Sequence, residues 1–172
     1  MDTKKILAFN VNHLTDARFF AAVGAAFIFF DGNEPPSKWI EYFSMMEWIE
    51  GSNFGFSFDY LPDEMTLSEL SENGIKFILL PSESLIKPLD GLTVFSRGSS
   101  PFSSNILIQN MNEVITQNEM YWQIISEKIS TQDFDQLKSL PNVGLAFEGT
   151  PESLVGVKDF DTLDQIIENW QF

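Results

Sequence analysis

The sequence predicts an α/β protein in which short buried strands alternate with helices. Short apolar runs recur along the 172 residues, a pattern typical of parallel strands that are covered on both faces. Segments with apolar residues at helical spacing separate the first four of these runs. Links of this length between strands favour right-handed βαβ crossovers. We therefore expect a parallel sheet built from repeated βα units.

Residues 5–30 contain the first unit. Residues 6–11 are an apolar run, and Asn12 offers a side chain that can cap the helix after it. Gly24 stands where a residue that ends a helix needs positive φ, and residues 26–30 are the next apolar run. This segment is therefore predicted to be strand, helix and strand.

The first half of the chain predicts two further helices, each between two strands. The first, at residues 37–50, has an apolar stripe made of Trp39, Phe43, Met46 and Ile49. The second opens with a capping-box pattern at residues 66–69 and ends at Asn73-Gly74. The strands next to them are predicted at residues 54–59 and 76–81.

The second half has strands but fewer helices. The link GSSPFSS is too short and too rich in Gly, Pro and Ser for a helix, and residues 82–91 have room for little more than one turn. A short helix is expected at residues 111–120, and two later helices start near Ser130 or Thr131 and at Asp159. The strands are predicted at residues 92–97, 105–110, 122–127 and 143–148. Eight strands are thus expected, with about two helices reduced to loops.

Composition limits the classes of function. A hydrophobic content of 44% with 17 Phe suits one well-filled domain over residues 1–172. The absence of cysteine excludes disulfides, thiolate catalysis and cysteine-ligated metals. A net charge of −15 argues against nucleic acid and anionic membranes as partners. No apolar run is long enough to span a membrane and no signal-peptide pattern is present, so we expect a cytoplasmic protein.

Two groups of residues resemble motifs of one enzyme family. Near the N-terminus these are Leu14, Asp16-Ala17 and Gly24-Ala25, and near the C-terminus Gly156-Val157-Lys158-Asp159 follows Glu152. They resemble the first unit, K-I-C-G-x-T-x-x-E-D-A, and the final G-x-K-D of phosphoribosylanthranilate isomerase, the (β/α)8 barrel of tryptophan biosynthesis. The resemblance implies a single (β/α)8 TIM barrel, shortened because such barrels usually exceed about 200 residues. An open doubly wound sheet is the alternative.

The resemblance places the family's catalytic pair on residues that cannot transfer protons. The isomerase reaction needs a general base and a general acid. The base is the cysteine of K-I-C-G, whose position here is Phe9, with Asn10 in place of the glycine. The acid, an aspartate that ends strand six, corresponds to Gln109, or to Asn110 with a shift of one residue. No catalytic residue is therefore predicted.

The glycine-rich phosphate turns of the family are also replaced. The turns A-G-G and S-G-V-E become Ser126-Glu127-Lys128 and Gly149-Thr150-Pro151-Glu152. The Glu127 carboxylate would repel a phosphate, although Lys128 could partly offset it. The family's arginine after strand two has no counterpart in residues 31–37.

Polar side chains at the predicted strand ends form a candidate ligand site at the barrel mouth. Carboxylates that converge there could hold a cation or an amine, whereas the alternative is ordinary polar capping of loops. Arg97 with Glu127 would then be a structural ion pair, and His13 is expected to be a solvated turn residue rather than a catalytic one. No cofactor and no metal site is predicted. The candidate site consists of Asn10, Asp31, Asp59, Arg97, Gln109, Glu127, Lys128 and Glu148.

Three functions are compatible with the sequence. The first is a catalytically degenerate relative of the isomerase that binds a small molecule or a protein partner. The second is an active phosphoribosylanthranilate isomerase with relocated catalytic groups. The third is a barrel enzyme with new chemistry based on the mouth carboxylates. Strand flanks left exposed by the missing helices would favour a homodimer.

Overall fold

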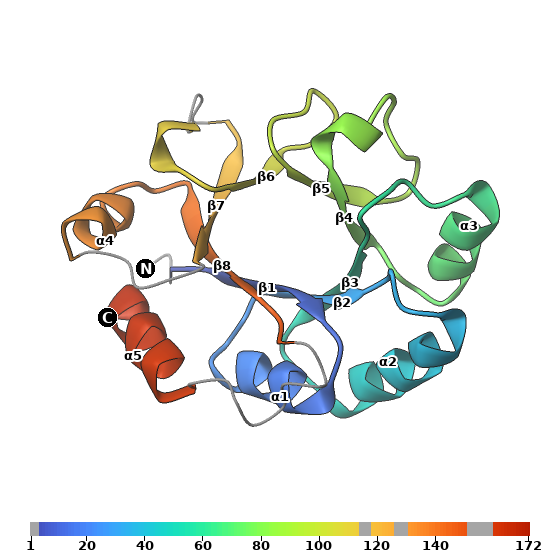
Figure 1. The fold of residues 1–172 in the computed structure, drawn as a ribbon, viewed down its shortest axis with the longest axis horizontal. Coiled ribbons are helices and arrows are strands. Elements are labelled where there is room, and N and C mark those ends of the chain that lie inside the picture. Colours follow the sequence, from blue (N-terminus) through green and yellow to red (C-terminus); the bar gives the residue numbers. More distant parts are fainter. Residues whose placement is uncertain (1–3, 114–117, 126–130, 151–159) are drawn as a thin grey trace.

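A computed structural model describes residues 4–113, 118–125, 131–150 and 160–172 of the chain. Eight parallel strands close into a barrel in chain order, and the described helices surround it (Figure 1). The strands are β1 (Ile6–Val11), β2 (Phe27–Asp31), β3 (Asn53–Ser57), β4 (Phe77–Pro81), β5 (Thr93–Arg97), β6 (Asn105–Ile108), β7 (Met120–Ile125) and β8 (Val143–Glu148). The helices are α1 (Leu14–Ala22), α2 (Pro36–Trp48), α3 (Glu64–Glu72), α4 (Thr131–Lys138) and α5 (Phe160–Gln171).

Pairing between the first and last strands closes the barrel. β1 and β8 run parallel, with Ile6 opposite Leu145 and Phe9 opposite Glu148. The prediction of a shortened (β/α)8 barrel is therefore confirmed, and the alternative of an open sheet is wrong.

Short connections replace long helices after β4 and β5, as predicted. The single 3₁₀ turn η1 (Ser82–Ser84) lies between β4 and β5, and the described residues 98–104 between β5 and β6 contain no helix. Of the short helix expected at residues 111–120, the described residues form the 3₁₀ turn η2 (Met111–Glu113) and, at Met120, the start of β7, so the helix does not reach residue 120. Residues 114–117 lie outside the described part of the chain.

The helix starts differ in detail from those predicted. His13, not Asn12, is the N-cap of α1, and Asp63 caps α3 by accepting a hydrogen bond of 2.8 Å from the Thr66 backbone N–H. The capping box at residues 66–69 is therefore wrong, because Thr66 lies inside the first turn of α3. The predicted end of α1 is confirmed, because Gly24 has φ +80. The predicted cap Asp159 lies outside the described residues.

Aromatic side chains fill the inside of the barrel. The Phe95 ring lies 4.8 Å from that of Phe27 and 4.9 Å from that of Phe29, both in edge-on contacts. Gly55 provides the room for Phe29, since a Cβ at that position would lie 2.7 Å from the ring. The interior is therefore a packed core and not a channel. Its buried members are Leu7, Phe9, Phe29, Leu79, Phe95, Leu107, Trp122 and Ala146.

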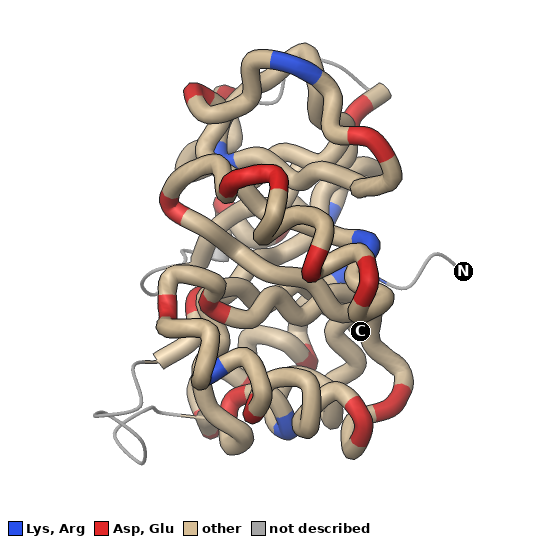
Figure 2. Tube along the Cα trace, turned by 90° about the vertical axis from the view of Figure 1, so that its right-hand side faces the viewer, with Lys and Arg blue, Asp and Glu red and all other residues tan. Residues whose placement is uncertain are grey.

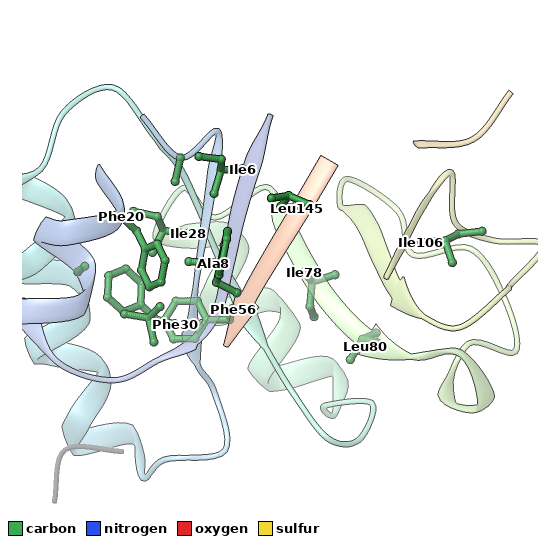
Figure 3. Packing of buried hydrophobic residues seen from close by; sticks show 14 of the residues in the cluster. Ile6, Ala8, Phe20, Ile28, Phe30, Phe56, Ile78, Leu80, Ile106 and Leu145 are labelled. Atoms are coloured by element: carbon green, nitrogen blue, oxygen red, sulfur yellow. The ribbon is translucent and has the colours of Figure 1, made fainter. Parts of the chain in front are cut away.

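A second apolar cluster lies between the strands and their outer cover. In the helix-bearing half, Phe20 of α1 and the strand residues Ile28, Phe30 and Phe56 belong to it (Figure 3). The outer faces of β5 and β6 are buried as well, at Val94, Ile106 and Ile108. Strand flanks are thus covered even where no helix lies over them, and the argument for a homodimer from exposed flanks is wrong.

Acidic side chains dominate the charged positions of the described chain. Asp and Glu are distributed over helices and loops and clearly outnumber Lys and Arg (Figure 2). Among the described helices, none has the length and apolar character needed to span a membrane.

Candidate functional site

Phe9, the residue that the sequence resemblance assigns to the base position, is part of the barrel core. Its side chain is 3% exposed and packs in the interior cluster together with Phe29 and Phe95. On β1, Leu7 and Phe9 belong to the interior cluster, whereas Ile6 and Ala8 belong to the outer one, as strand alternation requires. The Phe9 ring is thus buried in the barrel interior.

Asn10 links three strands at the mouth. Its Nδ2 donates to Glu148 Oε1 at 3.0 Å, and its Oδ1 accepts a hydrogen bond of 2.8 Å from the Ser57 hydroxyl. Asn10 has φ +52, a left-handed conformation that asparagine tolerates better than most residues other than glycine. Asn10 therefore adopts a backbone conformation that favours glycine, and its side chain ties β1 to β3 and β8.

A second polar chain runs from β2 to β5. Asp31 Oδ1 accepts from the Asn33 side chain at 2.9 Å, and Asn33 Oδ1 accepts from the Asp59 backbone N–H at 2.9 Å. Arg97 Nη2 then donates to Asp59 Oδ1 and to the Phe58 carbonyl oxygen, each at 3.1 Å. Arg97 thus forms an ion pair with Asp59, and the pair expected between Arg97 and Glu127 involves a residue outside the described part of the chain. Glu127 and Lys128 lie outside the described residues.

Gln109, which the sequence resemblance assigns to the acid position, is held in place by hydrogen bonds of its backbone. Its N–H donates to Glu113 Oε1 at 3.2 Å, and its carbonyl oxygen accepts from Gln123 Nε2 at 2.8 Å. The neighbouring Asn110 N–H donates to the same Glu113 oxygen at 3.0 Å. Both side chains at the candidate acid position are therefore amides, exposed on a turn that Glu113 fixes.

A buried polar group lies where β8 meets the start of α1. His13 Nδ1 accepts from the Asp16 backbone N–H, and its Nε2 lies 3.3 Å from Asp16 Oδ2. The same carboxylate oxygen accepts a hydrogen bond of 2.6 Å from the Thr150 N–H. His13 is 6% exposed, so the expectation of a solvated turn residue is wrong. Its position follows from its role as the helix cap beside a buried carboxylate.

Five of the predicted mouth residues form two groups and not one cluster. Asn10 bonds directly to Glu148 and also to Ser57, whereas Asp31, Asp59 and Arg97 are linked through Asn33. Gln109 bonds to Glu113 and Gln123 instead. The described residues contain no group of three or more His, Cys, Asp or Glu side chains arranged to hold a metal ion. Sequence reasoning missed Ser57, although it is the one hydroxyl in the apolar stretch FGFSFD and therefore stands out.

Comparison with solved structures places the closed barrel in a recognisable fold class. The fold is that of phosphoribosylanthranilate isomerases, (β/α)8 barrels that match the chain over almost its whole length. The enzyme from Thermus thermophilus is 16% identical, with a TM-score of 0.61, and the match covers 96% of this chain and 97% of that one. The enzyme from Thermotoga maritima is 15% identical, with a TM-score of 0.62, covering 96% and 98%.

A third structure contains a bound ligand. It is a phosphoribosylanthranilate isomerase in complex with reduced 1-(o-carboxyphenylamino)-1-deoxyribulose 5-phosphate, with a TM-score of 0.66 at 14% identity, covering 96% of this chain and 97% of that one. No family model and no curated protein matches the sequence. At such identities the likeness is one of fold.

Proposed function

We propose that this protein is a divergent relative of phosphoribosylanthranilate isomerase that has lost the isomerase reaction and acts by binding a small molecule or a protein partner in the cytoplasm. The observation that carries the proposal is the pair Phe9 and Gln109. These residues stand at the positions that the family motifs assign to the base and the acid.

Neither residue can supply the required proton transfer. A phenyl ring has no lone pair for a proton, and the Phe9 ring lies within the packed interior. The amide of Gln109 or Asn110 neither releases nor accepts a proton near neutral pH. General acid and base catalysis contributes about 10²–10⁴-fold for each group. Loss of both groups therefore removes most of the rate acceleration of the chemical step.

The turn after β8 supports the same proposal. The Gly149 N–H donates to the Phe9 carbonyl oxygen at 2.7 Å, and the Thr150 N–H donates to Asp16 at 2.6 Å. Backbone N–H groups of a turn hold a phosphate only when they are free to point at it. The described N–H groups of this turn are committed to the protein itself, so the phosphate would lack these donors.

The alternative of new chemistry at the mouth rests on Asp31, Asp59 and Glu148. Each of these carboxylates accepts a hydrogen bond from a neighbouring side chain, namely Asn33, Arg97 and Asn10. Such bonds fix the loops of the mouth, which is a structural role. We therefore favour binding over a new reaction.

Genetic complementation tests the proposal. The chain is expressed in a tryptophan auxotroph that lacks the isomerase, with an active isomerase on the same plasmid as the control. We expect no growth without tryptophan, although the protein accumulates in the cells. Growth comparable with that of the control would overturn the proposed loss of activity.

Repair of the catalytic pair alone should also fail. The double variant Phe9→Cys with Gln109→Asp restores a base and an acid but not the phosphate turns, and positioning of the substrate supplies a comparable or larger share of the barrier. Inorganic phosphate should raise the melting temperature of neither protein, since any ligand of the folded state stabilises it by mass action. A clear shift at millimolar phosphate would mean that an anion site survives.

A further inference from the structure

A groove lies on the outer side of the barrel, between α3 and the connection from β4 to β5 (Figure 1). It has a volume of about 760 Å³, and all of its lining residues fall between residues 61 and 92, inside the longest continuously described part of the chain. In a complete (β/α)8 barrel a helix follows each strand. After β4 only the 3₁₀ turn η1 forms, so the groove lies beside α3 at the outer position that a fourth helix would take.

Leucine side chains form the floor of the groove. Leu67 comes from α3, and the other lining residues of this helix share one face with it at helical spacing. The floor leucines are half-buried and pack against the outer apolar cluster, so the floor is continuous with the core and still open to solvent. They are Leu61, Leu67, Leu89 and Leu92.

The apolar surface continues onto the rim at Ile86. Its side chain lines the groove and is 77% exposed, although contact of a large aliphatic side chain with water is unfavourable. Sites for small molecules enclose most of their ligand, and a small ligand on the leucine floor would leave this rim in water. A peptide segment that lies along the groove would cover both the floor and Ile86.

Carboxylates outnumber basic groups around the groove. Asp63, Glu64 and Asp90 line it, against the single ammonium group of Lys87. The whole of α3 contains no Lys or Arg. Such a rim attracts Lys and Arg side chains and repels acidic segments and anionic lipids.

A second copy of this chain does not offer a matching helix in its described part. None of the described helices has more Lys and Arg than Asp and Glu, and α1, with one residue of each sign, is the least acidic of them. The net charge of −15 further opposes association of two copies. A basic helix in the groove would therefore come from a different protein.

We propose that this groove binds a basic amphipathic helix of a partner protein. The apolar side chains of that helix cover the leucine floor and Ile86, while its Lys or Arg side chains face the carboxylates of the rim. A helix that lies in an apolar groove is a recurring mode of peptide recognition, with anchors at i, i+3, i+4 and i+7. The inference rests on the proposed binding function and names its partner class. None of the lining residues belongs to the barrel mouth.

Selection of peptides against the whole chain tests the proposal. The probe is a display library of random peptides of about 16 residues, roughly four helical turns. The tightest binders are synthesised, and their affinities are measured by fluorescence anisotropy. We expect sequences with apolar residues at helical spacing and an excess of Lys and Arg. Their binding should weaken as the salt concentration is raised from about 50 to about 500 mM.

A matched pair of isoleucines tests the apolar rim. Ile86→Ser removes the aliphatic side chain without adding a charge and should weaken binding of the selected peptide about tenfold or more. Ile40 on α2 is 70% exposed and does not line the groove, so Ile40→Ser should leave binding unchanged. Both side chains are exposed, so both variants keep the fold intact.

A matched pair of glutamates tests the rim charge. Glu64 lines the groove, whereas Glu69 is an exposed residue of the same helix that does not line it. Glu64→Gln should weaken binding about two- to fivefold, the range of an exposed ion pair, and Glu69→Gln should have less effect. The difference between the two variants should vanish at about 500 mM salt.

The proposal is overturned if no peptide of the library binds with a dissociation constant below about 1 mM, or if the binders lack helical spacing or an excess of basic residues. It is also overturned if the two variants of either matched pair behave alike. Displacement of the selected peptide by phosphatidylserine vesicles would make the groove a lipid site and would equally contradict the proposal. None of these outcomes alters the result of complementation, so failure here and failure of the proposed loss of activity are distinguishable.

Discussion

The two halves of the barrel cover their strands in different ways. β1, β2 and β3 are each followed by an α-helix, whereas β4, β5 and β6 are followed by η1, a loop and η2. The outer faces are nevertheless buried in both halves, at Ile28 and Phe30 in the first and at Ile106 and Ile108 in the second. Barrel closure thus requires an apolar cover on the strands, and the cover need not be a helix.

The two kinds of cover differ in how the peptide groups of their own backbones are hydrogen-bonded. A helix pairs its peptide groups internally, whereas a loop needs side chains or water for the same purpose. In the second half serine hydroxyls connect the loop to the strands, since Ser103 Oγ is hydrogen-bonded to the carbonyl oxygens of Val94 in β5 at 2.9 Å and Asn105 in β6 at 2.8 Å. Ser96 Oγ donates to the Gly98 carbonyl oxygen at 2.8 Å. The loop cover therefore depends on polar contacts that the helix cover does not need.

The largest loss of stability should follow removal of a buried ring from the helix-covered half. The Phe56 ring is buried against Trp39 at 4.9 Å, Phe43 at 5.8 Å and Tyr42 at 5.9 Å. Phe56→Ala should lower the free energy of unfolding by about 3–5 kcal/mol, measured by urea denaturation, because rigid helices cannot collapse into the cavity. Phe172→Ala, at an exposed ring, is the control. A loss below about 1 kcal/mol would contradict a tightly packed cover.

The loop-covered half should respond less to a similar truncation. Leu85 is 6% exposed, and we expect Leu85→Ala to cost about 2–3 kcal/mol, the lower part of the usual range, because a loop can relax. The neighbouring Ile86 is 77% exposed, so Ile86→Ala should change the free energy of unfolding by less than about 0.5 kcal/mol. Equal losses for the two variants would show that Leu85 does not serve as a cover.

Removal of a serine hydroxyl should destabilise the loop-covered half more than the helix-covered half. Ser103→Ala leaves the buried carbonyl oxygen of Val94 in β5 without its hydroxyl partner and should cost about 1–2 kcal/mol. Ser44 is its counterpart in the helix-covered half, where its hydroxyl bonds only to the Ile40 carbonyl oxygen of the same helix. Ser44→Ala should be neutral within about 0.5 kcal/mol, since alanine is the better helix former. Urea denaturation of both variants measures the contrast.

The smallest effect should come from the helix cap of α3. The backbone N–H of Thr66 donates to the Asp63 carboxylate and lowers the pKa of Asp63 below its usual 3.8. A carboxyl group whose pKa is lower in the folded state stabilises the fold at pH values above its unfolded pKa. This contribution is lost as the pH falls through the folded pKa. Asp63→Ala should therefore lower the melting temperature at pH 7 and have a smaller effect near pH 2. The matched variant Asp63→Asn keeps an acceptor and should remove this pH dependence.

Several elements followed from the sequence alone. The run at residues 143–148 coincides with β8, and Gly24 ends α1 with the positive φ that its position required. GSSPFSS was excluded as a helix on composition and is a loop. Such features are local, because apolar periodicity, glycine and short polar links constrain the chain within a few residues.

The candidate site was predicted only in part, because its partners come from distant parts of the chain. Asn10, Asp59 and Arg97 were expected at strand ends, but the sequence did not say that Asn10 would join Glu148 or that Arg97 would choose Asp59. His13 was misjudged for the same reason, since the buried Asp16 beside it is held by Thr150, far along the chain.

The sequence by itself determined that the chain is an α/β protein with eight strands and no thiol chemistry. It also determined that Phe9 and Gln109 carry no proton-transferring group, because side-chain chemistry does not depend on the fold. Only the tertiary structure decided that the outer faces of β5 and β6 are buried without helices, and that Gln123 carries a buried oxygen with no hydrogen-bond partner among the described residues. Burial and pairing arise between segments that are distant in sequence, and barrel closure alone brings those segments together.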